Sequence, residues 1–330
     1  GEKKNNLFEP PPPPHNIHLH SAERCYPLPT SVFLPPCRII PVRGKKEVKR
    51  ERPKAAKKKK GQMRTNGFSA PLSPLQVVTW FLFPFFLSSF TALTLLPLSR
   101  LSPYLFVPGG LVYALAAVAA YHGYVTTKID PCSPILKEHC RQAEPPRTVG
   151  GEGKKFCWVC QLHVESSTQH CRFCSKCVLG FDHHCVWLNT CVGTLNYKPF
   201  FRTVVTVWAF TAAMTAMQAL AVGLWFSDDG EGGGIREGVA GLYGGDPSSA
   251  WGAYSVLSIC YLAVLANTVA MISQLLDFHL NLRRKGMSTY DYVIADSKAR
   301  QEREKRGREE RAERRREEKR RRERGQRKVL

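Results

Sequence analysis

Four long stretches without a charged residue stand out in the sequence. They cover residues 75–98, 101–121, 203–226 and 250–276. Each is long enough to cross a hydrocarbon core of about 30 Å as a helix, which takes about 20 residues. A helix buried in a soluble core seldom stays uncharged over this length, and the prolines of the first two stretches are tolerated in bilayer helices. The pattern therefore predicts an all-α polytopic membrane protein with four transmembrane helices.

The charges beside these stretches predict the orientation of the chain in the membrane. Residues 45–60 are rich in lysine and arginine, and three basic residues at 283–285 follow the fourth stretch. The loop 227–249 holds five acidic residues and a single basic one, Arg236. Because positive loops stay on the cytosolic side, we expect both ends of the chain and the loop between helices 2 and 3 to lie in the cytosol.

The same features divide the sequence into five expected parts. In chain order these are a disordered, basic cytosolic tail (1–70), transmembrane helices 1 and 2 (71–124), a cytosolic cysteine-rich module (125–199), transmembrane helices 3 and 4 (200–278) and a charged cytosolic tail (279–330). The formal net charge is +21, so the basic tails should attract the bilayer and its anionic headgroups. Residues 298–328 predict a solvated charged helix or a disordered segment. Nucleic acid is not an expected partner, because no aromatic residue there could stack on bases.

The loop between the second and third helices is rich in cysteine. Seven of the twelve cysteines lie from Cys157 to Cys191. If the loop is cytosolic, it lies in a reducing compartment, where disulfides are disfavoured and cysteine clusters bind metal ions. The cysteine content of this loop therefore favours metal binding over disulfide formation.

The spacing of the ligands makes the metal prediction specific. A first set has the spacing C-x2-C-x9-H-x6-C, and a second set repeats it 14 residues further along. Three cysteines and one histidine complete a tetrahedral zinc site with no open position. Two interleaved structural zinc ions are predicted, and their binding would supply folding energy to a polar loop. The two sets are Cys157, Cys160, His170 and Cys177, and Cys171, Cys174, His184 and Cys191.

This assignment leaves Cys185 and His183 outside both sets. Cys185 would begin a third set, but Leu188 stands where its partner cysteine is expected. A thiolate is a nucleophile, a neighbouring histidine can take the thiol proton, and a carboxylate such as Asp182 can orient the imidazole. We interpret Cys185, His183 and Asp182 as nucleophile, base and orienting group. The plainer interpretation is a spare buried thiol beside a surface histidine.

Here the sequence resembles a known family, the DHHC protein S-acyltransferases, or palmitoyltransferases. The tetrapeptide at 182–185 carries the resemblance, inside an array that is similar to the family from residue 157 to residue 200. Four helices with the array between the second and third also fit, as does Asp130-Pro131 after the second helix. The other matching residues are Trp187, Asn189, Val192, Gly193, Asn196 and Phe200.

The resemblance implies a protein S-palmitoyltransferase. In such an enzyme Cys185 is acylated by palmitoyl-CoA, a long-chain acyl-CoA co-substrate, and then passes the acyl group to cysteines of membrane-associated proteins. Trp187 and Thr289 are assigned to the acyl-CoA site. The expected location is the endomembrane system (endoplasmic reticulum, Golgi or plasma membrane), with the active site facing the cytosol.

Three departures from the family pattern concern neighbouring positions. A Lys-Pro-x-Arg stretch, which could bind the phosphates of CoA, is replaced by residues 164–167, Val-Glu-Ser-Ser. The family's Thr-Thr-x-Glu after the fourth helix is Ser-Thr-Tyr-Asp at residues 288–291, so that Thr289 could still form a hydrogen bond near Asp182. An asparagine before the last zinc cysteine is replaced by Thr190.

Other classes of protein explain the sequence less well. A non-catalytic membrane zinc scaffold is the main alternative, but it has no need of Asp182, His183 and Cys185. A RING-like ubiquitin ligase also uses interleaved zinc ions, with a less regular spacing. A channel or transporter is disfavoured because the four stretches contain no charged residue.

Overall fold

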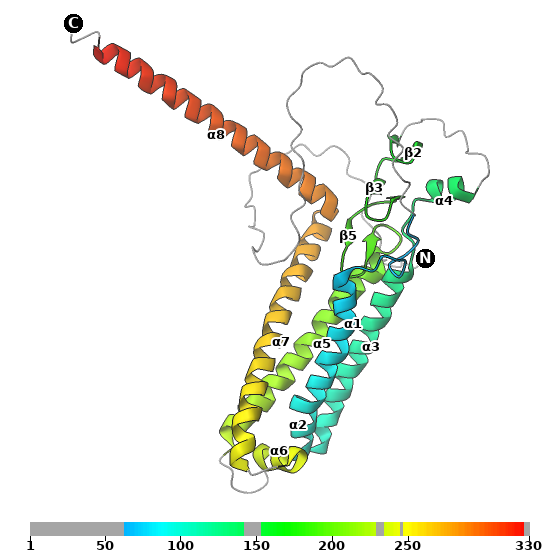
Figure 1. Cartoon of the computed structure of the whole chain (residues 1–330), viewed down its shortest axis with the longest axis vertical. Helices are drawn as coiled ribbons and strands as arrows, with labels where there is room; N and C mark the ends of the chain where they lie inside the picture. The colour runs from blue at the N-terminus through cyan, green and yellow to red at the C-terminus, as the bar shows by residue number, and fades with distance from the viewer. Residues whose placement is uncertain (1–62, 142–152, 229–233, 245–246, 327–330) are drawn as a thin grey trace, which may run out of the picture.

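A computed structural model describes residues 63–141, 153–228, 234–244 and 247–326 of the chain. Four long helices run side by side as a bundle (Figure 1). Three small hairpins and a short helix lie at one end of the bundle, and a last long helix projects away from that end. The short helix α6 (Ile235–Tyr243) lies at the opposite end.

The helices of the bundle match the predicted spans. Four helical segments are long and apolar enough to cross a membrane, so the predicted fold class is confirmed. The first is built from α1, a π-helical turn η1 and α2, and the second from η2 and α3. The segments are Pro74–Leu101, Pro103–Lys128, Tyr197–Ser227 and Gly252–Arg284. The elements are α1 (Pro74–Phe90), η1 (Thr91–Leu95), α2 (Leu96–Leu101), η2 (Pro103–Leu105), α3 (Phe106–Lys128), α5 (Tyr197–Ser227) and α7 (Pro247–Arg284).

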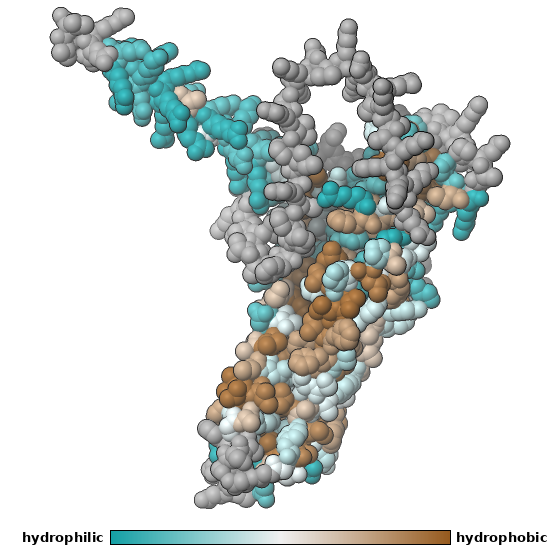
Figure 2. Space-filling view, viewed as in Figure 1, coloured by the Kyte–Doolittle hydropathy of each residue, from teal (hydrophilic) through white to brown (hydrophobic). Residues whose placement is uncertain are grey.

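Apolar side chains cover much of the outer surface of the bundle. Figure 2 shows brown, hydrophobic patches along it and hydrophilic residues on the projecting helix. Large side chains such as Phe81 and Val107 are 72% and 75% exposed. A soluble protein would bury such residues, whereas lipid tails solvate them. The exposed faces agree with the bundle being the membrane-spanning part.

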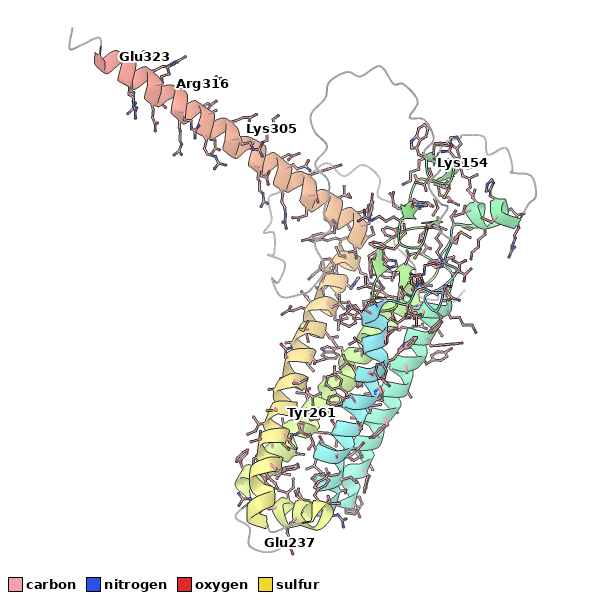
Figure 3. The ribbon with its side chains drawn as sticks, viewed as in Figure 1. Lys154, Glu237, Tyr261, Lys305, Arg316 and Glu323 are labelled. Atoms are coloured by element: carbon pink, nitrogen blue, oxygen red, sulfur yellow. The ribbon has the colours of Figure 1, made fainter. Side chains whose placement is uncertain are left out.

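A proline in the first segment is accommodated by a neighbouring helix. Pro97 has no N–H group, so the carbonyl of Leu93, four residues earlier, loses its usual helical donor. The hydroxyl of Tyr254 on α7 donates to this carbonyl at 2.7 Å. Tyr261, labelled in Figure 3, similarly donates to the carbonyl of Phe86 at 2.8 Å. Side chains from α7 thus satisfy backbone groups that lipid could not.

The cysteine-rich region folds as three antiparallel hairpins. Each hairpin consists of two short strands and a tight turn, and together they follow the helix α4 (Pro134–Arg141). The strands are β1 (Lys154–Cys157), β2 (Leu162–Glu165), β3 (Gln169–Cys171), β4 (Lys176–Val178), β5 (His183–Cys185) and β6 (Thr190–Val192). Hydrophobic side chains alone give such short hairpins little core.

The last helix, α8 (Thr289–Gln326), is long and almost fully exposed. Its surface is lined by charged residues such as Lys305, Arg316 and Glu323 (Figure 3). Pairs at i and i+4, such as Arg321 with Glu317 at 3.5 Å, support the helix. Of the two structures expected for residues 298–328, the structure has the charged helix as far as Gln326.

Two expected boundaries are placed differently in the structure. Residues 1–62 of the predicted N-terminal tail lie outside the described residues, whereas residues 63–70 pack against the hairpins, with Arg64 only 8% exposed. At the other boundary, α7 continues to Arg284, so His279 belongs to this helix rather than to the C-terminal tail. Both segments therefore lie next to the hairpins.

A buried amide links three helices of the bundle. Gln218 on α5 is fully buried, accepts a hydrogen bond from Thr94, and donates to the carbonyl of Ser258 on α7 at 3.2 Å. Gln218→Ala should lower the free energy of unfolding of the detergent-purified protein by on the order of 1 kcal/mol, because a hydrogen bond between membrane helices contributes about that much. Gln274→Ala, on an exposed position of α7, is the control; an equal loss in both variants would contradict the role of Gln218.

Candidate active site

The first metal-binding group joins two hairpins. Cys157 and Cys160 belong to the turn between β1 and β2, whereas His170 and Cys177 face each other across β3 and β4. Nδ1 of His170 lies 3.3 Å from Sγ of Cys160 and 3.8 Å from Sγ of Cys177, and the two sulfurs are 3.6 Å apart. All four ligand atoms lie within 4.8 Å of one another. One ion here would connect the first hairpin to the second.

The second group repeats this arrangement one hairpin later. Cys171 and Cys174 belong to the turn between β3 and β4, and His184 faces Cys191 across β5 and β6. Nδ1 of His184 lies 3.8, 3.4 and 3.6 Å from the sulfurs of Cys171, Cys174 and Cys191. The two predicted sets are thus both assembled, and the second would connect hairpins two and three.

The donors of both groups fit zinc. Zinc bonds to sulfur are about 2.3 Å long, so tetrahedral geometry separates two sulfurs by roughly 3.8 Å. The sulfur–sulfur distances of 3.6 Å (Cys177–Cys160) and 3.5 Å (Cys191–Cys174) are close to this value. Three thiolates and one imidazole are a typical structural zinc set, and they leave no open coordination position.

The 14-residue repeat extends to the third hairpin, where the pairing of ligands stops. Gln161, Ser175 and Asn189 all have positive φ, at 57°, 51° and 54°, so the same turn recurs three times. Cys185 holds in the third turn the place that Cys171 holds in the second, and it pairs with Thr190 in register. Leu188 replaces the second cysteine. The thiol of Cys185 therefore lies outside both metal-binding groups.

His183 connects this thiol to Asp182. Nδ1 of His183 lies 2.7 Å from Oδ2 of Asp182, and Cys185 follows His183 by two residues at the end of β5. Burial alone would lower the pKa of His183, but the interactions with Asp182 and Cys185 outweigh it and raise this pKa to about 9. With Nδ1 occupied by the carboxylate, the other ring nitrogen is left for the thiol. The three residues predicted as a catalytic set are thus adjacent in the structure.

Asp182 is also bound to the start of helix α8. Oδ1 of Asp182 accepts a hydrogen bond from the backbone N–H of Thr289 at 2.9 Å. Burial would raise the pKa of Asp182, but the bonds from His183 and Thr289 lower it below its usual value. Thr289 contributes its backbone N–H, a helix-terminal group without an intrahelical acceptor that favours a negative charge.

A capping box fixes the start of this helix. The backbone N–H of Asp291 donates to Oγ of Ser288 at 3.1 Å, and the Ser288 hydroxyl donates to the Asp291 carboxylate at 2.7 Å. The Ser-x-x-Asp spacing is that of a capping box. Tyr290 packs edge-on against Phe181, with ring centroids 5.7 Å apart. The residues after the fourth span therefore hold α8 against the segment that carries Asp182.

Trp187 lies in the turn of the third hairpin, two residues after Cys185. Its side chain is 47% exposed. Neither Cys132 nor Cys140, the other cysteines near the module, belongs to a metal-binding group. Cys132 is fully buried, and burial together with the Asp130 carboxylate raises the pKa of its thiol to about 12. A thiol with this pKa is a poor nucleophile at neutral pH.

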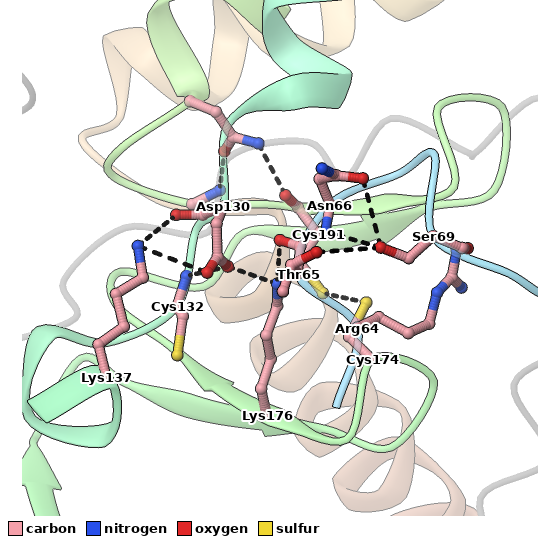
Figure 4. A network of polar contacts seen from close by, with 12 residues as sticks. Arg64, Thr65, Asn66, Ser69, Asp130, Cys132, Lys137, Cys174, Lys176 and Cys191 are labelled. Carbon is pink, nitrogen blue, oxygen red and sulfur yellow. Dashed lines mark hydrogen bonds and ion pairs between the residues drawn. The ribbon is translucent and has the colours of Figure 1, made fainter. Parts of the chain in front are cut away.

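An ion pair attaches the second hairpin to the end of α3. The ammonium group of Lys176 on β4 lies 2.6 Å from Oδ1 of Asp130 and also donates to the carbonyl of Thr65 at 3.0 Å (Figure 4). The Lys176 side chain is 1% exposed, so losing Asp130 would leave its buried charge unpaired. A second attachment joins the third hairpin to α3. The side-chain amide of Asn196 donates to the carbonyl of Cys191 on β6 and to the carbonyl of Thr126 on α3.

Residues 63–72, which we call the N-terminal strap, hold the turn of the third hairpin. The side chain of Asn189 donates to the carbonyls of Gly67 and Pro71 at 3.1 and 3.2 Å. Arg64 donates to the carbonyl of Asn189 at 3.1 Å. A Cβ atom at Gly67 would collide with the Leu188 carbonyl, which explains the glycine at this position. The strap therefore fixes the turn in which Cys185 lies.

The departures from the family pattern have local structural consequences. Oε2 of Glu165, in the stretch that replaces the basic one, accepts hydrogen bonds from Ser133 and Thr168 at 3.1 and 3.0 Å. This stretch therefore contributes a structural contact instead of positive charge. Thr190 is buried, and its hydroxyl has no partner among the described residues.

Sequence reasoning did not identify two elements of the site. The strap carries no recognisable motif. The need for glycine at position 67 becomes clear only from the structure, where the Leu188 carbonyl lies close to it. His279 was assigned to the tail, although it lies three residues after Leu276 and so on the same face of α7. A histidine at the end of an uncharged stretch was the available signal for it.

Four helices that can span a membrane and a module with two metal-binding groups define a multi-pass membrane protein. Residues 151–296 match the family described as DHHC palmitoyltransferase. This part of the chain, which holds the hairpins and the third and fourth spans, therefore contains a domain of the kind that this family describes.

Individual relatives are similar to parts of this chain. The chain is 33% identical over 168 residues to "Probable protein S-acyltransferase 20" of Arabidopsis thaliana, covering 50% of this chain and 23% of the relative. It is 29% identical over 261 residues to "Palmitoyltransferase ZDHHC11" of Homo sapiens, covering 71% of this chain and 60% of the relative. A 50-residue match to "Palmitoyltransferase ZDHHC23-A" of Danio rerio is 54% identical and covers 15% and 12%. The chain thus spans less than two thirds of each of these relatives.

The two metal-binding groups lead to a prediction about zinc content. Elemental analysis of the purified protein should find two zinc ions per chain. Cys174→Ser should lower the zinc content and destabilise the hairpins, because it opens a closed site that contributes folding energy. Cys140→Ser, at an exposed cysteine outside both groups, should retain both ions. One zinc ion or none in the unmodified protein would reject the assignment.

Proposed function

We propose that the protein is a protein S-palmitoyltransferase that works through a thioester on Cys185. The observation that carries this proposal is the position of Cys185, which lies outside both metal-binding groups and next to the hydrogen-bonded His183–Asp182 pair. A structural cysteine would not need this pair. The match of residues 151–296 to a family described as palmitoyltransferases supports the same chemistry.

The first half-reaction loads the enzyme. The raised pKa of His183 favours an imidazolium that has already taken the proton of the Cys185 thiol, and the resulting thiolate attacks the carbonyl carbon of the acyl-CoA thioester. A bond from carbon to the Cys185 sulfur forms, and the bond to the CoA sulfur breaks. His183 then gives its proton to the departing CoA thiolate. Asp182 stabilises the imidazolium during this step and keeps the ring oriented.

The second half-reaction transfers the acyl group to a protein. A cysteine thiol of the substrate loses its proton to His183 and attacks the acyl carbon on Cys185. The bond to the substrate sulfur forms, Cys185 leaves as a thiolate, and His183 returns a proton to it. One thioester replaces another in both halves, so the covalent relay needs no external energy source.

The surroundings of Cys185 suit a co-substrate whose CoA part lies in water and whose acyl chain lies among apolar side chains. Its side chain clusters with Phe200 and Val204 of α5, and Leu276 of α7 packs against this cluster. These residues belong to spans three and four, so an acyl chain held in the bundle would lead directly to the thiol. We infer from the flanking charges that this end of the bundle faces the cytosol, where acyl-CoA is available.

The central test is acyl labelling of variants. The purified protein, incubated with palmitoyl-CoA that is labelled in its acyl chain, should become labelled, and neutral hydroxylamine should release the label. Cys185→Ser should abolish this label and retain both zinc ions, because eight other side chains fill the two groups. Cys132→Ser is the matched control at a buried cysteine outside the metal-binding groups. If Cys185→Ser lost zinc, Cys185 would have to be a zinc ligand. If this variant were labelled fully, another cysteine would have to be the nucleophile.

Variants of the neighbouring pair test the assigned roles. His183→Ala should slow loading about 10²–10⁴-fold, the usual contribution of a general base. Asp182→Asn should have a comparable or smaller effect, because the imidazole loses its orienting carboxylate but keeps its place. Rapid-quench measurement of thioester formation checks both. Unchanged rates with normal zinc content would reject the roles assigned to His183 and Asp182.

The inferred orientation predicts the modification of an inserted site. A glycosylation acceptor placed within residues 227–249 should be glycosylated in cells, because this loop would face the lumen. An acceptor of the same sequence inserted after residue 326, at the end of α8, should stay unmodified. The reverse pattern would place the hairpins on the luminal side.

A further inference from the structure

A buried histidine beside the nucleophile has no role in the reaction as written above. His279 on α7 is 2% exposed, and its Nδ1 has no hydrogen-bond partner among the described residues. Its ring centroid lies 6.0 Å from that of His183 and 5.1 Å from that of Phe200. A buried ring nitrogen without a partner destabilises the folded protein. This cost is offset if a substrate atom becomes the partner.

His279 lies beside the cluster of side chains that contains Cys185. Leu276, one turn earlier on the same face of α7, packs against the cluster that contains Cys185. Phe200 contacts His183 at 5.2 Å and belongs to the same cluster, so His279, His183 and Cys185 surround one aromatic ring. Among the described residues, the other buried side-chain nitrogens without a partner belong to Arg64 in the strap and to His139 on α4.

We propose that His279 donates a hydrogen bond from Nδ1 to the carbonyl oxygen of the acyl group. This inference rests on the proposed function. When the Cys185 thiolate attacks, the electron pair of the C=O double bond moves to oxygen and forms a tetrahedral oxyanion. The pair returns when the CoA thiolate leaves. A neutral His279 with its proton on Nδ1 stabilises the oxyanion more than the ground-state carbonyl, which is the requirement for catalysis.

This role differs from merely positioning His183. A positioning residue would affect every reaction of the Cys185 thiol, whereas an oxyanion donor affects attack on a carbonyl alone. Alkylation by iodoacetamide provides the comparison. The thiolate there displaces iodide from a saturated carbon, and no charge develops on an oxygen atom at the reacting centre.

The experiment measures both reactions of Cys185 in each variant. Loading is followed with palmitoyl-CoA, and alkylation with iodoacetamide is read by peptide mass spectrometry at Cys185. His279→Phe keeps an aromatic ring without a donor and should load 10²–10³-fold more slowly, the usual effect of losing one oxyanion donor. Its alkylation rate, zinc content and KM for palmitoyl-CoA should stay near those of the unmodified protein. His279→Gln, which can donate from its amide, should recover at least tenfold of the loss.

His139→Phe is the matched control, since His139 on α4 also has an unpartnered buried Nδ1 but lies in the segment before the hairpins. It should load at the unmodified rate. If His279→Phe does not retain zinc, His279→Leu replaces it as the variant without a donor. Equal losses of loading and alkylation would overturn the donor role, as would unchanged loading or a His279→Gln variant no better than His279→Phe. Failure of the unmodified protein to load at all would instead overturn the proposed function.

Discussion

The pairing of ligands across neighbouring hairpins is the constraint on which the rest of the module depends. Each metal-binding group takes two cysteines from the turn of one hairpin and a facing histidine and cysteine from the next. Short two-stranded ribbons are hardly stable on their own, so an ion that bridges two of them fixes both their fold and their relative position. The hairpins therefore lie next to one another in the same order as in the sequence. The third hairpin packs against α5.

The third hairpin keeps the turn of the other two, although no residue of this turn belongs to a metal-binding group. Loss of the second cysteine leaves the sulfur of Cys185 free to react, but it also removes the ligand that would hold the turn. Other contacts take over this task. Asn189 binds the strap, the Leu188 carbonyl lies against Gly67, and Cys185 itself packs against α5. These contacts hold the turn without using the thiol, which is what a nucleophile requires.

Much of this arrangement could be predicted from the sequence, because it depends on spacing. The 14-residue repeat identified both ligand sets and the leftover Cys185, and uncharged stretches identified four spans. What could not be predicted depends on contacts between distant segments. The strap reaches the third hairpin across more than 100 residues of sequence, as in the bond from Arg64 to Asn189. The extension of α7 to His279 depends on packing against α5 and the hairpin, which no local pattern reports.

Asp182 explains why the segment after the fourth span matters to a site more than 100 residues earlier. A buried carboxylate needs hydrogen bonds to remain ionised, and Asp182 receives them from His183 and from the N-terminus of α8. The capping box of Ser288 and Asp291 sets where that helix begins, and so determines which backbone N–H faces the carboxylate. Conservative changes in the box, such as serine for threonine or aspartate for glutamate, preserve this start. The departure from the family pattern at residues 288–291 therefore leaves the electrostatics of His183 intact, whereas the loss of basic residues at 164–167 changes the charge of the surface.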